Sequence, residues 1–82
     1  MVIPTTNEKR FRRTMNGHTG ETWVDVGLLR YAVELYEDGV FVKRMRGFRP
    51  ARDSVEVFVS GREFTTLVHI ERNGRVRCNL SC

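Results

Sequence analysis

Two turn dipeptides, Asp38-Gly39 and Asn73-Gly74, constrain the fold of this chain more than any other feature. They lie in "LYEDGVFV" and "HIERNGRVR", where apolar, β-branched or aromatic residues flank the dipeptide. Asp-Gly and Asn-Gly favour the two-residue turns of antiparallel hairpins, because both turn positions need a positive φ. The sequence therefore predicts two hairpins, one turning at 38–39 and the other at 73–74.

The flanking residues predict how the strands pair. A two-residue turn at 38–39 places Glu34 opposite Lys43, which is a favourable cross-strand pair. The same turn length at 73–74 places His69 opposite Cys78. Between these hairpins, "SVEVFVSGREFTTLVHIE" alternates apolar residues on both sides of Gly61. This alternation predicts a third hairpin.

Residues 25–39, "DVGLLRYAVELYEDG", fit an amphipathic helix as well as a strand. A helix would place Glu37 and Asp38 at the negative end of its dipole. The preceding "TWVDV" has the β-branched and aromatic composition of a strand. We therefore favour a strand over this segment.

The first segment carries different signals. Thr5 and Glu8 fit a capping box, Phe11 and Met15 are four residues apart on one helical face, and an Asn-Gly dipeptide follows. These features predict a short, basic N-terminal helix.

Together the signals predict one domain over residues 1–82 that is α+β or mainly β. We expect an antiparallel meander of about five strands over 21–82 and a basic segment, helical in part, over 1–20.

Trp23 is expected to be largely buried, because a thin core needs its area. The predicted register also loads the second face of the sheet with apolar side chains, so the N-terminal segment, a second copy of the chain or a partner protein should cover it. Those side chains are Phe58, Leu67, Val76, Cys78 and Leu80.

The basic residues are clustered, although the net charge is only +4. Residues 9–13 hold four bases and residues 43–52 hold five, and neither stretch contains an acid. Twelve of the fourteen bases are arginine, whose planar fork suits phosphate and carboxylate groups. Clusters of this kind indicate contact with a polyanion or an acidic surface.

The sequence offers little for catalysis or for cofactors. Cys78 opposite His69 is the one thiol and imidazole that the predicted register brings together, and its apolar neighbours favour packing over catalysis. The cysteines, Cys78 and Cys82, and the histidines, His18 and His69, do not have the spacing of a usual zinc site. No stretch is long and apolar enough to cross a bilayer. We expect a cytoplasmic protein that is not an enzyme and that binds neither metal, cofactor nor membrane.

Two functions in different classes fit these features. The leading hypothesis is an accessory factor that binds nucleic acid or a nucleoprotein. The alternative is a protein-interaction inhibitor or adaptor, of the size found among viral and mobile-element proteins, that binds an acidic surface of a larger complex. Both hypotheses use cations interleaved with aromatic rings, and a homodimer is compatible with either. The candidate binding residues are Lys9, Arg10, Arg12, Arg13, Arg30, Tyr36, Phe41, Lys43, Arg44, Met45, Arg46, Arg49 and Arg52.

Overall fold

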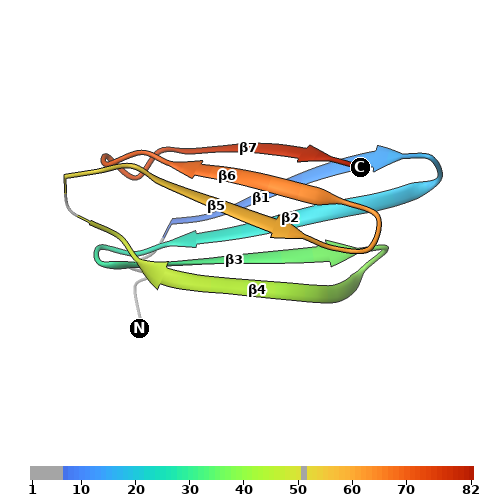
Figure 1. Cartoon of the computed structure of the whole chain (residues 1–82), viewed down its shortest axis with the longest axis horizontal. Coiled ribbons are helices and arrows are strands. Elements are labelled where there is room, and N and C mark those ends of the chain that lie inside the picture. The colour runs from blue at the N-terminus through green and yellow to red at the C-terminus, as the bar shows by residue number, and fades with distance from the viewer. Residues whose placement is uncertain (1–6, 51) are drawn as a thin grey trace, which may run out of the picture.

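The computed structural model describes residues 7–50 and 52–82, and this part of the chain is all β (Figure 1). It contains seven antiparallel strands and no helix. The strands are β1 (Asn7–Met15), β2 (His18–Val26), β3 (Arg30–Glu37), β4 (Val40–Phe48), β5 (Val55–Ser60), β6 (Thr65–Ile70) and β7 (Val76–Ser81).

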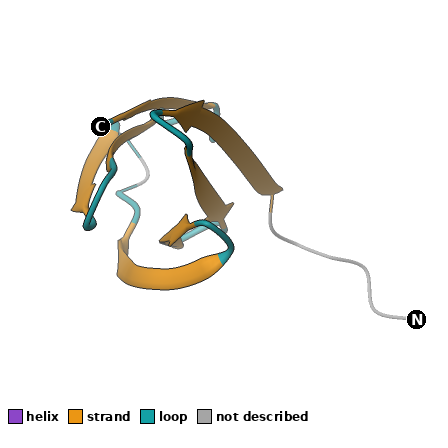
Figure 2. Ribbon diagram, turned by 90° about the vertical axis from the view of Figure 1, so that its right-hand side faces the viewer, coloured by secondary structure: helices purple, strands orange, loops and turns teal. Residues whose placement is uncertain are grey.

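The strands form two sheets, a four-stranded sheet in the order β1-β2-β3-β4 and a three-stranded sheet in the order β5-β6-β7. Viewed from one end, the two sheets curl around a common interior (Figure 2). The predicted fold of about five strands with an N-terminal helix is therefore wrong. Its single meander is in fact two meanders, joined by the segment between β4 and β5.

The predicted N-terminal helix is replaced by the hairpin of β1 and β2. Met15 pairs with His18 across a two-residue turn, in which Asn16 has a φ of 52° and Gly17 a φ of 79°. Residues four apart share a face in a strand as well as in a helix, so Phe11 and Met15 both point to the interior in this hairpin. Thr5 of the expected capping box lies outside the described residues.

The hairpin at 38–39 is confirmed, and residues 30–37 form a strand as predicted. Asp38 has a φ of 52° and Gly39 a φ of 80°, and Glu37 pairs with Val40 across the turn. A β-bulge then shifts the register by one residue, so that Glu34 lies opposite Arg44 instead of Lys43.

The hairpin at residues 73–74 has a longer loop than predicted. Ile70 pairs with Val76, and the backbone N–H of Glu71 donates to the carbonyl of Arg75, which leaves a three-residue loop, 72–74. Within this loop region the N–H of Gly74 donates to the carbonyl of Glu71. One extra residue moves every side chain of β7 to the opposite face. Val76, Cys78 and Leu80 consequently pack on the core instead of loading a second face.

The core lies between the two sheets and draws on alternate residues of their strands. Val24, Val33 and Leu35 come from the four-stranded sheet and are fully buried. Phe64 closes one end, and its ring lies over Gly20, where an added Cβ would come within 2.7 Å of the ring. The residues that complete the core are Val26, Val57, Val59, Val68, Ile70 and Leu80. The sheets cover each other, so no helix is needed to cover either of them.

Polar side chains also link the two sheets. In the core, the hydroxyl of Thr22 donates to that of Thr66 over 2.9 Å. At one edge, Arg13 Nη1 donates to the carbonyl of Leu80 over 2.9 Å. These contacts join one side of the four-stranded sheet to the three-stranded sheet, and the other side points away from it. We call that side, which points away from the three-stranded sheet, the outer face.

Candidate functional site

Three aromatic side chains form a continuous row across the outer face. Trp23 on β2 lies 4.7 Å from Tyr36 on β3 between ring centroids, and Tyr36 meets Phe41 on β4 edge to face at 5.7 Å. Arg10 lies over Trp23 at 4.0 Å from its centroid, and Arg44 lies over Phe41 at 5.5 Å. We call Trp23, Tyr36 and Phe41 the aromatic row. Arginines therefore bracket this row at both ends.

Ion pairs hold most of the arginines around the aromatic row. Arg12 pairs with Glu21 at 3.0 Å, and Arg44 pairs with Glu34 at 2.6 Å. Arg10 pairs with Glu8 in the same way, at 3.1 Å. In two of these pairs, those of Arg10 and Arg44, a carboxylate orients a planar guanidinium that lies beside a ring, so this part of the outer face is arranged before any partner binds.

Two pKa shifts follow from these contacts. The indole N–H of Trp23 donates to the carboxylate of Glu21, and this bond, together with the bond from Arg12, lowers the pKa of Glu21. Burial raises the pKa of Tyr36, and the nearby carboxylate of Glu34 raises it further. At neutral pH Glu21 is therefore ionised, and Tyr36 keeps the proton that it donates to Glu34.

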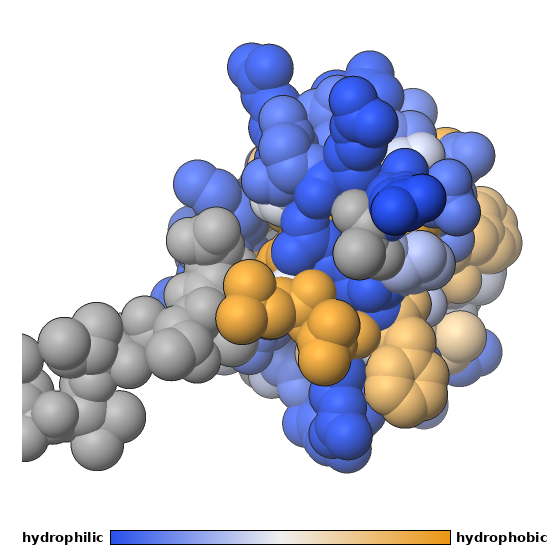
Figure 3. All heavy atoms as spheres, turned by 90° about the vertical axis from the view of Figure 1, so that its left-hand side faces the viewer, coloured by the Kyte–Doolittle hydropathy of each residue, from blue (hydrophilic) through white to orange (hydrophobic). Residues whose placement is uncertain are grey.

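An apolar end adjoins the outer face at the β2–β3 loop. Leu28 is 84% exposed and Leu29 66% exposed, and Phe48 at the end of β4 is 75% exposed. Figure 3 shows apolar atoms gathered at this end of the molecule beside strongly hydrophilic side chains. Arg30 lies over the ring of Phe48 at 5.6 Å from its centroid.

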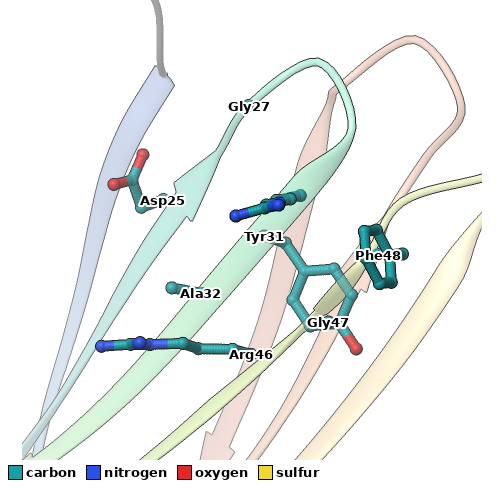
Figure 4. Close-up of a pocket in the computed structure, with 8 residues that line it drawn as sticks. Asp25, Gly27, Tyr31, Ala32, Arg46, Gly47 and Phe48 are labelled. Atoms are coloured by element: carbon teal, nitrogen blue, oxygen red, sulfur yellow. The ribbon is translucent and has the colours of Figure 1, made fainter.

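A hollow of about 580 Å³ runs from this apolar end onto the outer face. Figure 4 shows Asp25 and Arg46 on either side of the small side chain of Ala32, with Phe48 at the far wall. Asp25 Oδ1 is buried and has no hydrogen-bond partner among the described residues. The hollow thus combines an apolar wall with one free acceptor and the guanidinium of Arg46.

The structure brings together seven of the predicted binding residues and separates the other six. The strand register places Arg10, Arg12, Arg30, Tyr36, Phe41, Arg44 and Arg46 on the outer face. It places Lys9, Arg13, Lys43 and Met45 on the opposite side of the same sheet. Arg49 is a structural residue, because its guanidinium donates to the carbonyls of Gly27 and Arg72 and ties two loops together. Arg52 is exposed in the segment between β4 and β5.

The prediction that Trp23 is largely buried is wrong. Its side chain is half-buried on the outer face instead of largely buried in the core. The signal was present, because Thr22, Val24 and Val26 alternate with more polar positions. That period of two places Trp23 with Glu21 and Asp25, on the side away from the core. Phe48, Leu28 and Leu29 were missed as well, and no local pattern marks them.

The corrected register of β7 also separates the thiol and imidazole predicted to face each other. His69 lies opposite Arg77, and Cys78 lies opposite Val68 on the core side, with its Sγ 3.2 Å from Thr66 Oγ1. Across residues 7–50 and 52–82, no group of three or more metal-ligating side chains is close enough to hold an ion. That part of the chain likewise has no helix that is long and apolar enough to cross a membrane.

Comparisons with known proteins assign the chain to no family: no family model matches it, and neither a curated protein nor a solved structure does.

One titratable contact joins the two hairpin turns of the four-stranded sheet. His18 Nδ1 lies 2.8 Å from Asp38 Oδ2, and the N–H of Thr19 donates to Asp38 Oδ1. The hydrogen bond and the charge of Asp38 raise the pKa of His18. The backbone bond from Thr19, followed by the bond from His18, lowers the pKa of Asp38.

The contact predicts a pH dependence of stability. A raised folded pKa means that the contribution of His18 is complete below its unfolded value of 6.5 and is lost as the pH rises through the folded value. The urea midpoint should therefore fall more between pH 5.5 and 8 for the wild type than for His18→Gln, which keeps a polar side chain that does not titrate. His69 is present in both proteins and serves as the internal control. Identical pH profiles would show that the pair contributes nothing to folding.

Proposed function

We propose that this chain is a non-catalytic binding module that docks its outer face on another protein, as an adaptor or an inhibitor. The observation that carries the proposal is the aromatic row with its bracketing arginines. Tryptophan, tyrosine and arginine dominate the binding energy of protein interfaces, because they bury large areas around fixed polar groups. The ion pairs beside the row reduce the entropy that binding would otherwise cost.

The charge balance of the outer face favours a protein over a nucleic acid. Five arginines share this face with four carboxylates, and three of those carboxylates are already in ion pairs. A surface for a polyphosphate needs a larger excess of positive charge, since phosphate neutralisation supplies most of its affinity. Arg30 and Arg46 have no carboxylate partner among the described residues, and they suit scattered acidic groups on a protein.

Nucleic acid is the second candidate, and a different surface supports it. Lys9 and Arg75 line a hollow of about 520 Å³ beside the β6–β7 loop, and Arg72 lies in that loop. Within the described residues, none of these three cations makes an ion pair with a carboxylate. The positive charges of Lys9, Arg72 and Arg75 would therefore be available to the phosphates of a nucleic acid.

One pair of phenylalanines tests the leading proposal. Phe41→Ala removes a ring that is 47% exposed in the aromatic row, whereas Phe58→Ala removes one that is 62% exposed on the three-stranded sheet. Each protein is immobilised, a nuclease-treated lysate is passed over it, and the captured protein is then purified and titrated. We expect Phe41→Ala to weaken binding by about 30-fold, the effect of removing a hot spot of ~2 kcal/mol. Phe58→Ala should bind as the wild type does.

The outcomes separate the two candidate functions. Capture that disappears with nuclease, falls steeply with salt and is lost in Lys9→Glu/Arg75→Glu would replace the protein proposal by the nucleic-acid one. Equal binding by the two phenylalanine variants would rule out the aromatic row as the contact surface.

A further inference from the structure

Strand β4 is the last strand of the four-stranded sheet and pairs with β3 alone. In Figure 1 it forms the border of the molecule, with no strand beyond it. No backbone hydrogen bond joins β4 to β5 in the part of the chain that the structure describes. One row of its N–H and C=O groups is therefore free to pair with another chain.

This strand is also exposed on both of its faces. Seven of its nine residues are exposed, including Val40, Phe41 and Met45, whereas alternate residues of β3 are buried. The inner side of β4, which carries Lys43 and Met45, is thus poorly covered by the three-stranded sheet. A strand added beside β4 would find side chains to pack against on either face.

The two-residue turn at 38–39 determines which backbone groups are free. The residues that flank such a turn, Glu37 and Val40, form a hydrogen-bonded pair, and the pairs then alternate along the strands. On β3 the residues that bond to β4 are therefore Glu37, Leu35 and Val33. The partners of Leu35 and Val33 are Lys43 and Met45, so Arg44 and Arg46 direct their N–H and C=O groups to the free edge.

The positive charge of β4 indicates which kind of chain can pair with its free edge. Lys43, Arg44 and Arg46 lie on β4, and the strand carries no acid. Arg44 pairs with Glu34 on β3, whereas neither Lys43 nor Arg46 has an ion-pair partner among the described residues. A second copy pairing β4 with β4 would bring these cations together, which is unfavourable. An extended chain with acidic residues would neutralise them.

We propose that the free edge of β4 binds an extended acidic segment of a partner protein, which adds to the four-stranded sheet as a fifth strand. Its backbone pairs with Arg44 and Arg46, and its alternate acidic side chains lie beside the guanidinium groups of these residues. This inference deepens the proposed function and rests on it, since the partner is a protein. The edge also continues the aromatic row, because Phe41 and Arg44 belong to both surfaces.

The probe for this proposal is a capped seven-residue peptide of alternating glutamate and valine, titrated at low salt and followed by amide NMR shifts. We expect saturable shifts in β4 and its neighbour β3, and no binding of the matched peptide with lysine in place of glutamate. Arg46→Ala removes the charge and keeps the backbone N–H, whereas Arg46→Pro removes both. Proline is tolerated where an edge N–H faces solvent, so the Arg46→Pro variant should fold. It should bind the peptide about 10-fold more weakly than Arg46→Ala does, because it lacks roughly one hydrogen bond.

A second measurement does not depend on the folding of the proline variant. Methylating the backbone nitrogens on one edge of the glutamate–valine peptide blocks its pairing without changing its charge. We expect wild-type protein to lose binding when the peptide edge that faces β4 is methylated and to keep it when the other edge is methylated.

Several results would overturn the proposal. They are equal binding of the lysine peptide, equal affinity of the two edge-methylated peptides, shifts confined to the outer face of β2 and β3, or no binding at millimolar peptide. Sedimentation that shows a wild-type dimer broken by Arg46→Pro would assign the edge to a second copy. None of these results touches the comparison of Phe41→Ala with Phe58→Ala, so the proposed function can fail or survive independently.

Discussion

Phe64→Ala should lower the free energy of unfolding by about 3–5 kcal/mol, the usual cost of removing a buried phenylalanine ring. The ring is 1% exposed and packs over the backbone of Gly20, which has no side chain that could move to fill the space. The total free energy of unfolding of a native domain is roughly 5–15 kcal/mol. We therefore expect a variant that is partly unfolded at 37 °C, measured by urea denaturation followed by circular dichroism.

Phe58→Ala is the matched control for this prediction. Phe58 lies on β5 of the same hairpin, but its ring is exposed on the outside of the three-stranded sheet. Truncating it should change stability by less than about 0.5 kcal/mol, as surface substitutions usually do. A loss similar to that of Phe64→Ala would mean that the two rings are not on opposite sides of this sheet.

Several hairpins of the fold could be predicted from the sequence, because the alternation of apolar residues along a strand indicates which side faces the core. It gave the strands around Asp38-Gly39 and the hairpin that turns near Gly61. The N-terminal hairpin was missed for a physical reason. The spacing of four residues between Phe11 and Met15 fits the helical period of 3.6 and the strand period of 2. The choice between helix and strand therefore depended on pairing with β2, which the local propensity of residues 7–15 does not reflect.

The loop at 73–74 shows what cross-strand chemistry adds to a turn signal. An Asn-Gly dipeptide fits a two-residue turn, but it also fits a three-residue loop with glycine in the left-handed position, and here only Gly74 has a positive φ, 87°. The two-residue register pairs Ile70 with Arg77, whereas the actual one pairs it with Val76. Apolar matching across the strands would have selected the longer loop.

The positions of the candidate site residues could be predicted only where the strand that carries them was predicted correctly. In a helix the four bases of residues 9–13 would form one patch, but in β1 they divide between two faces. Arg10 and Arg12 lie on the outer face with the aromatic row, and Arg13 instead bonds to the backbone of Leu80. The bulge after Phe41 likewise could not be read from composition, because it changes which basic residue of β4 meets Glu34 without changing any residue.

The second large effect is expected at Glu37, a buried carboxylate that clamps the two sheets together. It is 7% exposed, and its Oε2 accepts hydrogen bonds from the backbone N–H groups of Glu63 and Phe64, at 2.9 and 2.8 Å. A methyl group on Gly61 would collide with this carboxylate, so the β5–β6 loop is fitted closely around it.

Glu37→Ala should lower the free energy of unfolding by about 3 kcal/mol, because it leaves two backbone donors without an acceptor at roughly 1–3 kcal/mol each. Glu37→Gln keeps an oxygen that can accept the same two bonds, so its loss should be near 1 kcal/mol, the difference between a charged and a neutral acceptor. Glu63→Ala keeps its backbone N–H and removes only an exposed side chain, and it should match the wild type within about 0.5 kcal/mol. Hydrogen exchange at the amides of Glu63 and Phe64 adds a local readout: both should exchange faster in Glu37→Ala than in Glu37→Gln. Equal losses in the alanine and glutamine variants would contradict this account, because glutamine keeps the volume and the accepting oxygen of the side chain whereas alanine keeps neither.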